Sequence, residues 1–114
     1  MQYLLLIYSE ETETSDPAEM QRWFDVTAAM KESGVFVAGE ALLSVSTATT
    51  VRARNGEVLH TDGPFAETKE QLGGFYLIDV ADADEALSWA RRLPTVDYGS
   101  VEVRPIMALP DSGA

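Results

Sequence analysis

The sequence predicts an α+β fold in which two helices pack against one face of an antiparallel sheet. Two segments carry apolar residues at helical spacing, and an aspartate that can cap a helix precedes each of them. Short apolar runs typical of strands flank these segments. The 114 residues suit one domain, which we expect to span residues 1–109, and residues 110–114 are expected to form a disordered tail.

The first strand and the first helix have the clearest signals. Residues 2–8 are almost continuously apolar, which is typical of a strand covered on both faces. A helix then begins at Asp16, because this residue can cap it, Pro17 fits the first turn and Glu19 completes a capping box. Gly34 ends the helix, since glycine readily adopts the left-handed backbone found there.

The apolar stripe of this helix is interpreted as core and not as a cofactor site. Its members recur every three or four residues, at Met20, Trp23, Phe24, Thr27 and Met30. This spacing places them on one side of the helix, where they can face the sheet.

A β-hairpin is predicted in the middle of the chain. Residues 48–54 and 57–61 flank an Asn-Gly dipeptide, the strongest short-range signal for a two-residue turn. Such a turn places Arg54 opposite Glu57, which makes an attractive cross-strand pair.

The remaining elements complete a recognisable order. We expect strands at residues 35–42, 74–80 and 100–107, and a second helix over residues 82–93 that stops before Pro94. The chain then reads strand, helix, strand, hairpin, strand, helix, strand. Without the inserted hairpin, this is the split βαβ order of a ferredoxin-like fold.

Both predicted helices cover the same face of the sheet, so the other face needs a different cover. Residues 4–7 and 75–78 are apolar on both sides of their strands. A second copy of the chain is the simplest cover. We therefore predict a homodimer packed sheet to sheet, of the dimeric α+β barrel type.

Charge and composition exclude several classes of partner. The formal net charge of −11 repels phosphate backbones and anionic lipids, so we expect neither direct nucleic-acid binding nor membrane binding. The apolar start is too short to span a bilayer and lacks the features of a signal peptide, so a cytoplasmic location is expected. The absence of cysteine excludes disulfides and a cysteine nucleophile.

Candidate binding residues come from charged and aromatic positions, because the sequence contains no phosphate-binding glycine loop, metal-ligand spacing or serine-nucleophile elbow. We therefore expect no cofactor and no metal. The candidates for ligand binding are Tyr8, Glu40, Asp62, Phe65, Glu67, Lys69, Glu70 and Arg104.

The densest run of special residues is 61–76. An Asp-Gly-Pro sequence turns the chain. Glu67 and Glu70 are three apart, so one helical turn would place both on one face near Lys69, where paired carboxylates can serve acid–base chemistry. The alternative, to which we give equal weight, is a corner that only redirects the chain.

His60 and Asp62 are the candidate catalytic pair. Two apart on a strand, they point the same way, which permits an imidazole oriented by a carboxylate to act as general base. The competing interpretation, which we favour, is an exposed histidine near the end of a hairpin.

Arg104 is a lone arginine in an apolar final strand and therefore needs a carboxylate partner. One interpretation is a structural salt bridge to Asp62, Glu67 or Glu70. The other is a clamp for an anionic ligand, since a guanidinium binds carboxylates and phosphates through two hydrogen bonds.

Residues 62–76, with their Asp-Gly-Pro-Phe and Glu-Thr-Lys-Glu sequences, resemble the signature of the DGPF branch of the YCII-related family of small bacterial α+β proteins. The apolar opening at 3–8, the stretch 39–42 and the final strand at 101–105 are similar to the family pattern in the same order. The resemblance implies a ferredoxin-like dimer with a pocket near the sheet interface.

The resemblance also implies two kinds of function. Some YCII-type relatives are similar to enzymes that act on small lactone or halogenated aromatic breakdown products with a His-Asp pair. This chain departs from them, because its first helix, residues 18–33, carries no histidine. DGPF-type members also occur fused to, or encoded beside, extracytoplasmic-function sigma factors, which implies a regulatory role.

Three hypotheses remain open after the sequence. The first is a protein of unassigned activity that binds a small molecule in a pocket near the dimer interface. In one form of this hypothesis the small molecule is anionic. The alternative is a non-catalytic regulatory module that binds a sigma factor. In the third, the charged run only stabilises the corner and the dimer. The sequence does not decide whether the protein is an enzyme.

Overall fold

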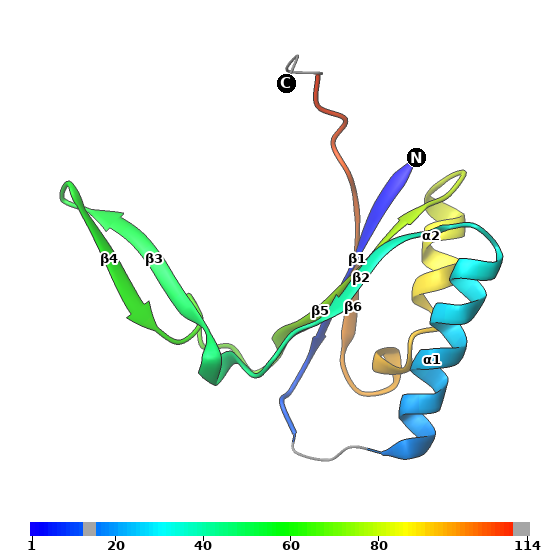
Figure 1. Cartoon of the computed structure of the whole chain (residues 1–114), viewed down its shortest axis with the longest axis horizontal. Coiled ribbons are helices and arrows are strands. Elements are labelled where there is room, and N and C mark those ends of the chain that lie inside the picture. Colours follow the sequence, from blue (N-terminus) through cyan, green and yellow to red (C-terminus); the bar gives the residue numbers. More distant parts are fainter. Residues whose placement is uncertain (13–15, 111–114) are drawn as a thin grey trace.

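Four strands form one antiparallel sheet in the order β2-β5-β1-β6 (Figure 1). They are β1 (Gln2–Ser9), β2 (Phe36–Ala41), β5 (Gln71–Asp79) and β6 (Ser100–Pro105). The computed structural model describes residues 1–12 and 16–110. This strand order is that of a split βαβ unit, so the predicted ferredoxin-like α+β fold is confirmed.

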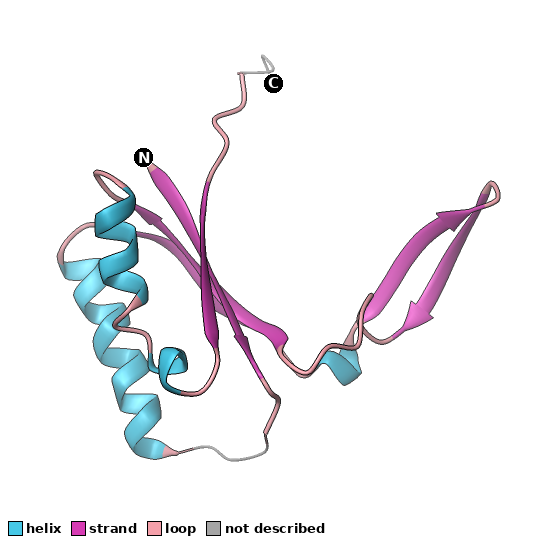
Figure 2. Ribbon diagram, turned by 180° about the vertical axis from the view of Figure 1, so that it is seen from behind, coloured by secondary structure: helices cyan, strands magenta, loops and turns pink. Residues whose placement is uncertain are grey.

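Two helices, α1 (Pro17–Glu32) and α2 (Ala83–Ala90), cover one face of the sheet and leave the other bare (Figure 1, and Figure 2 from behind). The core lies between these layers, because every second side chain of a strand points toward the helices. Its fully buried members include Leu5, Met30 and Ile78. Burial of such a side chain stabilises the fold by about 1.5–3 kcal/mol.

Both helices begin at the aspartate that the sequence predicts as a cap. Asp16 accepts a hydrogen bond from the Ala18 N–H at 3.0 Å, and Asp82 accepts one from the Glu85 N–H at 2.9 Å. Each cap satisfies an amide that the start of a helix leaves without a partner. Gly34 follows α1 with φ = 79°, the left-handed conformation predicted for this position.

The predicted hairpin consists of β3 (Thr49–Arg54) and β4 (Glu57–Asp62), which form a separate two-stranded sheet. Asn55 and Gly56 have φ of 53° and 80°, as a two-residue turn of type I′ requires. The arginine and glutamate that flank this turn lie opposite each other, as expected. The hairpin projects away from the sheet, on the side that the helices leave bare (Figures 1 and 2).

The segment between the hairpin and β5 differs from the prediction. β5 begins at Gln71 and not at residue 74, and residues 63–70 form a loop without helix. The helical turn considered for Glu67 and Glu70 is therefore wrong. The loop instead spans the distance between the projecting hairpin and the sheet, which one helical turn would shorten.

The second helix is shorter than predicted. It ends at Ala90, and a 3-10 turn (Pro94–Asp97) follows. Of the expected tail at 110–114, all but Pro110 lies outside the described residues. Within the described part of the chain, no helix is both long and apolar enough to cross a membrane.

Candidate functional site

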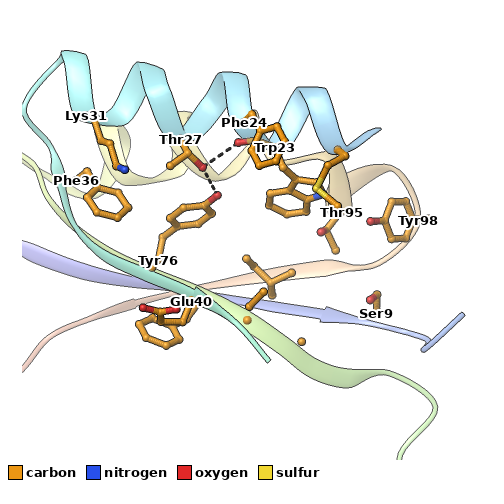
Figure 3. A pocket seen from close by; sticks show the side chains of 17 residues that line it. Ser9, Trp23, Phe24, Thr27, Lys31, Phe36, Glu40, Tyr76, Thr95 and Tyr98 are labelled. Atoms are coloured by element: carbon orange, nitrogen blue, oxygen red, sulfur yellow. Dashed lines mark hydrogen bonds between the residues drawn. The ribbon is translucent and has the colours of Figure 1, made fainter. Parts of the chain in front are cut away.

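A cavity lies between α1 and the sheet, on the face that the helices cover (Figure 3). Its volume is about 490 Å³, within the range of pockets that hold small molecules. Side chains of α1 form one wall, and those of β2 and β5 form the other. Three large aromatic side chains, Trp23, Phe36 and Tyr76, make much of this lining apolar.

Two glycines allow close packing beneath the cavity. A Cβ at Gly39 would lie 2.8 Å from Cδ1 of Tyr76, so glycine lets the tyrosine ring lie against β2. A Cβ at Gly74 would lie 2.8 Å from the carbonyl oxygen of Glu40, so glycine lets β2 and β5 approach each other. A larger residue at either position would displace the cavity floor.

Tyr76 lies between two other aromatic rings. Trp23 stacks on it with ring centroids 6.4 Å apart and planes at 22°. Phe36 meets it edge-on, with centroids 6.4 Å apart and planes at 75°. Each such pair contributes about 0.5–1.5 kcal/mol beyond its buried area, so these contacts hold the Tyr76 ring in one orientation.

The Tyr76 hydroxyl is the central polar group of the cavity. Its oxygen lies 2.6 Å from Oγ1 of Thr27, and this Oγ1 donates to the Trp23 carbonyl oxygen at 2.8 Å (Figure 3). A threonine hydroxyl has one proton, so Tyr76 must be the donor to Thr27. The Tyr76 oxygen then retains lone pairs but no free proton. It can only accept a hydrogen bond from a bound molecule.

Lys31 supplies a positive charge at one end of the cavity. Its Nζ lies 5.0 Å from the centroid of the Phe36 ring, a cation–π distance. No described carboxylate forms an ion pair with this ammonium. Lys31 is therefore available to an anionic group of a ligand.

Two hydroxyl side chains, Thr95 and Tyr98, also line the cavity. Thr95 is 1% exposed, and its Oγ1 forms no hydrogen bond of normal geometry with any described residue. This oxygen exposes almost no surface, so it lies behind the cavity wall and out of reach of a ligand. Partial burial raises the pKa of the Tyr98 hydroxyl, and an interaction with the Thr95 side chain opposes that rise.

The eight predicted binding residues do not converge on this cavity. Glu40 is the one member of the set that lines it. The Glu40 side chain points to the bare face of the sheet, because Glu40 pairs with Phe75 whereas Gly39 pairs with the cavity residue Tyr76 (Figure 3). Glu40 therefore contributes backbone, and not a carboxylate, to the cavity.

Tyr8 and Arg104 meet on the bare face through Glu102, which sequence reasoning missed. Tyr8 Oη donates to Glu102 Oε1 at 3.4 Å, and Arg104 Nη2 donates to Glu102 Oε2 at 2.7 Å. The hydrogen bond and charge of Glu102 raise the pKa of Arg104. The salt bridge considered between Arg104 and a carboxylate of residues 62–70 is wrong, since side chains two apart on a strand already share a face.

The candidate residues of the 63–70 loop are spread over the surface. Lys69 pairs with Glu10 at 3.5 Å. Glu70 accepts a hydrogen bond from the β6 serine at 2.9 Å. Phe65 is 78% exposed, and Glu67 is exposed as well. These surface contacts attach the loop to the rest of the fold. Its charged side chains do not converge on one binding site.

His60 and Asp62 lie on β4 of the projecting hairpin and are both exposed. Among the hydrogen bonds of the described residues, none joins the two side chains, so nothing there orients the imidazole. In residues 1–12 and 16–110, no group of three or more histidine, cysteine, aspartate or glutamate residues could hold a metal ion.

Comparison with known sequences gives the family. The sequence profile of the YCII-related domain matches residues 1–110. This chain belongs to the YCII-related family. An uncharacterized protein of Rhizobium meliloti (strain 1021) is 43% identical over 114 aligned positions, which cover 93% of this chain and 92% of that protein.

Sequence reasoning missed the side chains that line the cavity of this YCII-related protein. The interpretation of the α1 stripe as core holds for Met30, which is fully buried, but not for Met20 and Phe24, which are 47% and 61% exposed and line the cavity. Two signals were present in the sequence. Thr27 places a hydroxyl within the apolar stripe, and Gly39 leaves a gap within an apolar strand.

Proposed function

We propose that this YCII-related protein binds a small amphipathic molecule in the cavity between α1 and the sheet. The cavity itself carries the proposal, because a half-open, mostly apolar cavity of about 490 Å³ with a few convergent polar groups is typical of a ligand pocket. Family membership supports the fold and does not specify the ligand.

The polar groups specify the chemistry of that ligand. A flat apolar body fits against the apolar cavity wall to which Trp23, Phe36 and Tyr76 contribute. A hydrogen-bond donor is needed at the Tyr76 oxygen, which can only accept. An anionic group fits beside Lys31. We therefore propose an aromatic acid that carries a hydroxyl or amino group.

Native mass spectrometry of the protein purified from its own host tests for an endogenous ligand. We expect a bound small mass that is released on denaturation. A binding test with a chosen probe complements it, in which para-hydroxybenzoate is titrated against the fluorescence of Trp23. No bound mass together with no saturable response to the probe would contradict the proposal.

Replacement of the cavity cation tests the anionic part of the ligand. We expect Lys31→Gln to weaken para-hydroxybenzoate binding about tenfold. A hydrogen bond to a charged group contributes about 1.5–3 kcal/mol, and solvent screening of the exposed Lys31 keeps the effect at the lower end of that range. Lys69→Gln is the matched control, since Lys69 is 86% exposed and pairs with Glu10 at the surface. Equal affinities for the two variants would remove Lys31 from the site.

We further propose that the protein is a cytoplasmic homodimer whose copies pack through their bare sheet faces. The cavity would then lie on the other side of the sheet from that interface (Figure 3). Leu4, Leu6, Phe75 and Leu77 support the homodimer, because they form an apolar centre on the face that no helix covers. A molar mass of one chain at micromolar concentration would contradict the dimer.

A second candidate function is a regulatory module that binds a sigma factor. Leu42 and Leu43, which are 49% and 81% exposed directly after β2, favour it as an apolar contact outside the bare face. Affinity purification from the host tests this candidate. Recovery of a sigma factor by the natural chain and not by Leu43→Asp would support it, and repeated failure to recover one would count against it.

A further inference from the structure

We propose that the hairpin of β3 and β4, residues 49–62, is an arm that packs against a second copy of this chain. The inference extends the homodimer proposed above by assigning a role to the one part of the fold that lies outside the two-layer unit. The arm is a contact surface in this proposal, and its partner is an identical chain.

No helix or strand of the described chain packs along the arm beyond its base. Every residue of 49–62 except Thr50 is exposed. Its described contacts stop at its base, where the Gly63 N–H donates to the Ala48 carbonyl oxygen at 2.7 Å and Arg52 donates to the Phe65 carbonyl oxygen at 2.8 Å. A hairpin of two strands is marginally stable in water, so this one needs a surface to pack on.

The overall dimensions agree with an arm that lies outside the compact unit. The radius of gyration is 16.5 Å, whereas a compact chain of this length has one of about 13 Å. The hairpin in Figure 1 lies far to one side of the sheet and contributes to this difference, as does the extended segment after β6. A folded segment that increases the size of a small protein in this way is typical of arms that embrace a neighbouring subunit.

The two faces of the arm differ in polarity. Val51 and Val58 lie on one face and are 60% and 65% exposed. Leu59 lies on the other face and is 44% exposed, and Phe65 at the base is 78% exposed. The face with Leu59 also carries Arg52, Arg54 and Glu57 and is mostly polar, whereas the face with Val51 and Val58 is the more apolar one. The more apolar face suits contact with a second protein surface.

The position of the arm identifies the partner as a second copy. It projects on the side of the sheet that α1 and α2 leave bare (Figures 1 and 2). A copy that placed its own bare face against this sheet would therefore lie beside the arm. By two-fold symmetry the arm of that copy would lie beside this chain, which gives the self-complementary contact of a closed dimer.

Charge also suits an identical partner. Residues 49–62 contain two arginines, one glutamate and one aspartate and so carry no net charge, whereas the whole chain carries −11. The rest of the surface therefore repels a second copy, and the arm does not. Arg52 and Arg54 share one face of the arm, where they can meet acidic groups of the strongly acidic partner chain.

Hydrogen exchange of the natural chain at two concentrations is the first test. At a concentration where the protein is dimeric, we expect the amides of β3 and β4 to exchange slowly. On dilution to the monomer, they should exchange at the rate of an open hairpin, because their protection depends on the partner. The helices serve as the internal control, since their protection should change much less.

A substitution in the arm is the second test. We expect Val58→Asp to weaken dimerisation at least tenfold in analytical ultracentrifugation, because it places a carboxylate in an apolar contact. Ala28→Asp is the matched control, since it adds the same charge at an exposed position on α1. Circular dichroism verifies that both variants fold. Hydrogen exchange of the natural chain gives an answer even if Val58→Asp does not fold.

A cross-link identifies the surface that the arm contacts. The chain has no cysteine, so Val58→Cys can carry a single photoreactive maleimide. In a mixture of isotope-labelled and unlabelled chains, we expect adducts between chains that join the arm to β1 or β5. If the protein is a dimer but its arm is unprotected and forms no such adduct, the role of the arm is wrong and the homodimer stands. If the protein is a monomer, both the arm contact and the homodimer are wrong. If the arm is protected only when a different protein is added, that protein, and not a second copy, is the partner of the arm.

Discussion

Tyr76 illustrates how one side chain defines the chemistry of the cavity. Its ring is fixed by Trp23 and Phe36, and its proton is committed to Thr27 because the Thr27 proton goes to a carbonyl oxygen of α1. The hydroxyl that faces a ligand is thereby an acceptor. Glu102 has a comparable role on the bare face, where its carboxylate joins Tyr8 to Arg104.

Removal of the Tyr76 hydroxyl tests this acceptor role. We expect Tyr76→Phe to weaken binding of para-hydroxybenzoate about two- to tenfold, because one neutral hydrogen bond contributes about 0.5–1.5 kcal/mol. Binding of para-methoxybenzoate, which has no proton to donate there, should change little. The measurement is the ratio of the two dissociation constants, and an unchanged ratio in Tyr76→Phe would contradict the assigned donor direction.

At the scale of elements, two glycines set the distance between β2 and β5. Gly39 and Gly74 lie where a side chain would meet an aromatic ring or a carbonyl oxygen at 2.8 Å. The position of the Tyr76 ring in the cavity therefore depends on Gly39, because a side chain at that position would displace the ring. The capped start of α1 fixes the opposite wall.

Gly74→Ala tests the spacing of the strands. We expect this variant to lower the free energy of unfolding by about 1–3 kcal/mol, because the new Cβ would overpack the backbone of β2. Gly73→Ala is the matched control, since its Cβ would meet the Ile7 carbonyl oxygen at an ordinary 3.9 Å. Chemical denaturation measures both variants, and equal losses of stability would show that close packing at Gly74 is not the cause.

At the scale of the whole molecule, one face of the sheet forms the core and the other remains bare. A projecting hairpin lies on the same side as that bare face (Figures 1 and 2). The net charge of −11 acts against any self-association, so apolar contacts must supply the free energy of a dimer. Varying the salt concentration therefore tests whether apolar attraction or charge repulsion dominates the association of two chains.

We expect a dimer whose dissociation constant falls as salt rises from about 10 mM to about 150 mM, because salt screens repulsion between like-charged chains. Sedimentation equilibrium measures it, with a limiting mass near twice the 12.4 kDa of one chain. Dissociation of the dimer by added salt would show that ion pairs between the copies, and not apolar contacts, hold it together.

Local interactions explain why most of the fold could be predicted. The caps at Asp16 and Asp82, the left-handed Gly34 and the hairpin turn each depend on a few neighbouring residues, and the structure has all of them. The predicted helical turn at Glu67 failed because the chain there must span from the hairpin to the sheet. That requirement is not visible in local sequence.

The sequence by itself determined the order of elements, the capped starts of both helices and the ferredoxin-like class, because these depend on periodicity, capping and turn chemistry. Its motif at residues 62–76 indicated the family by resemblance. The tertiary structure alone decided where a cavity lies and which groups face it. Thr27 and Tyr76 are 49 residues apart in the chain, and the packing of α1 across β5 brings their hydroxyls together. A cavity is the space left between such distant elements, so no local pattern encodes it.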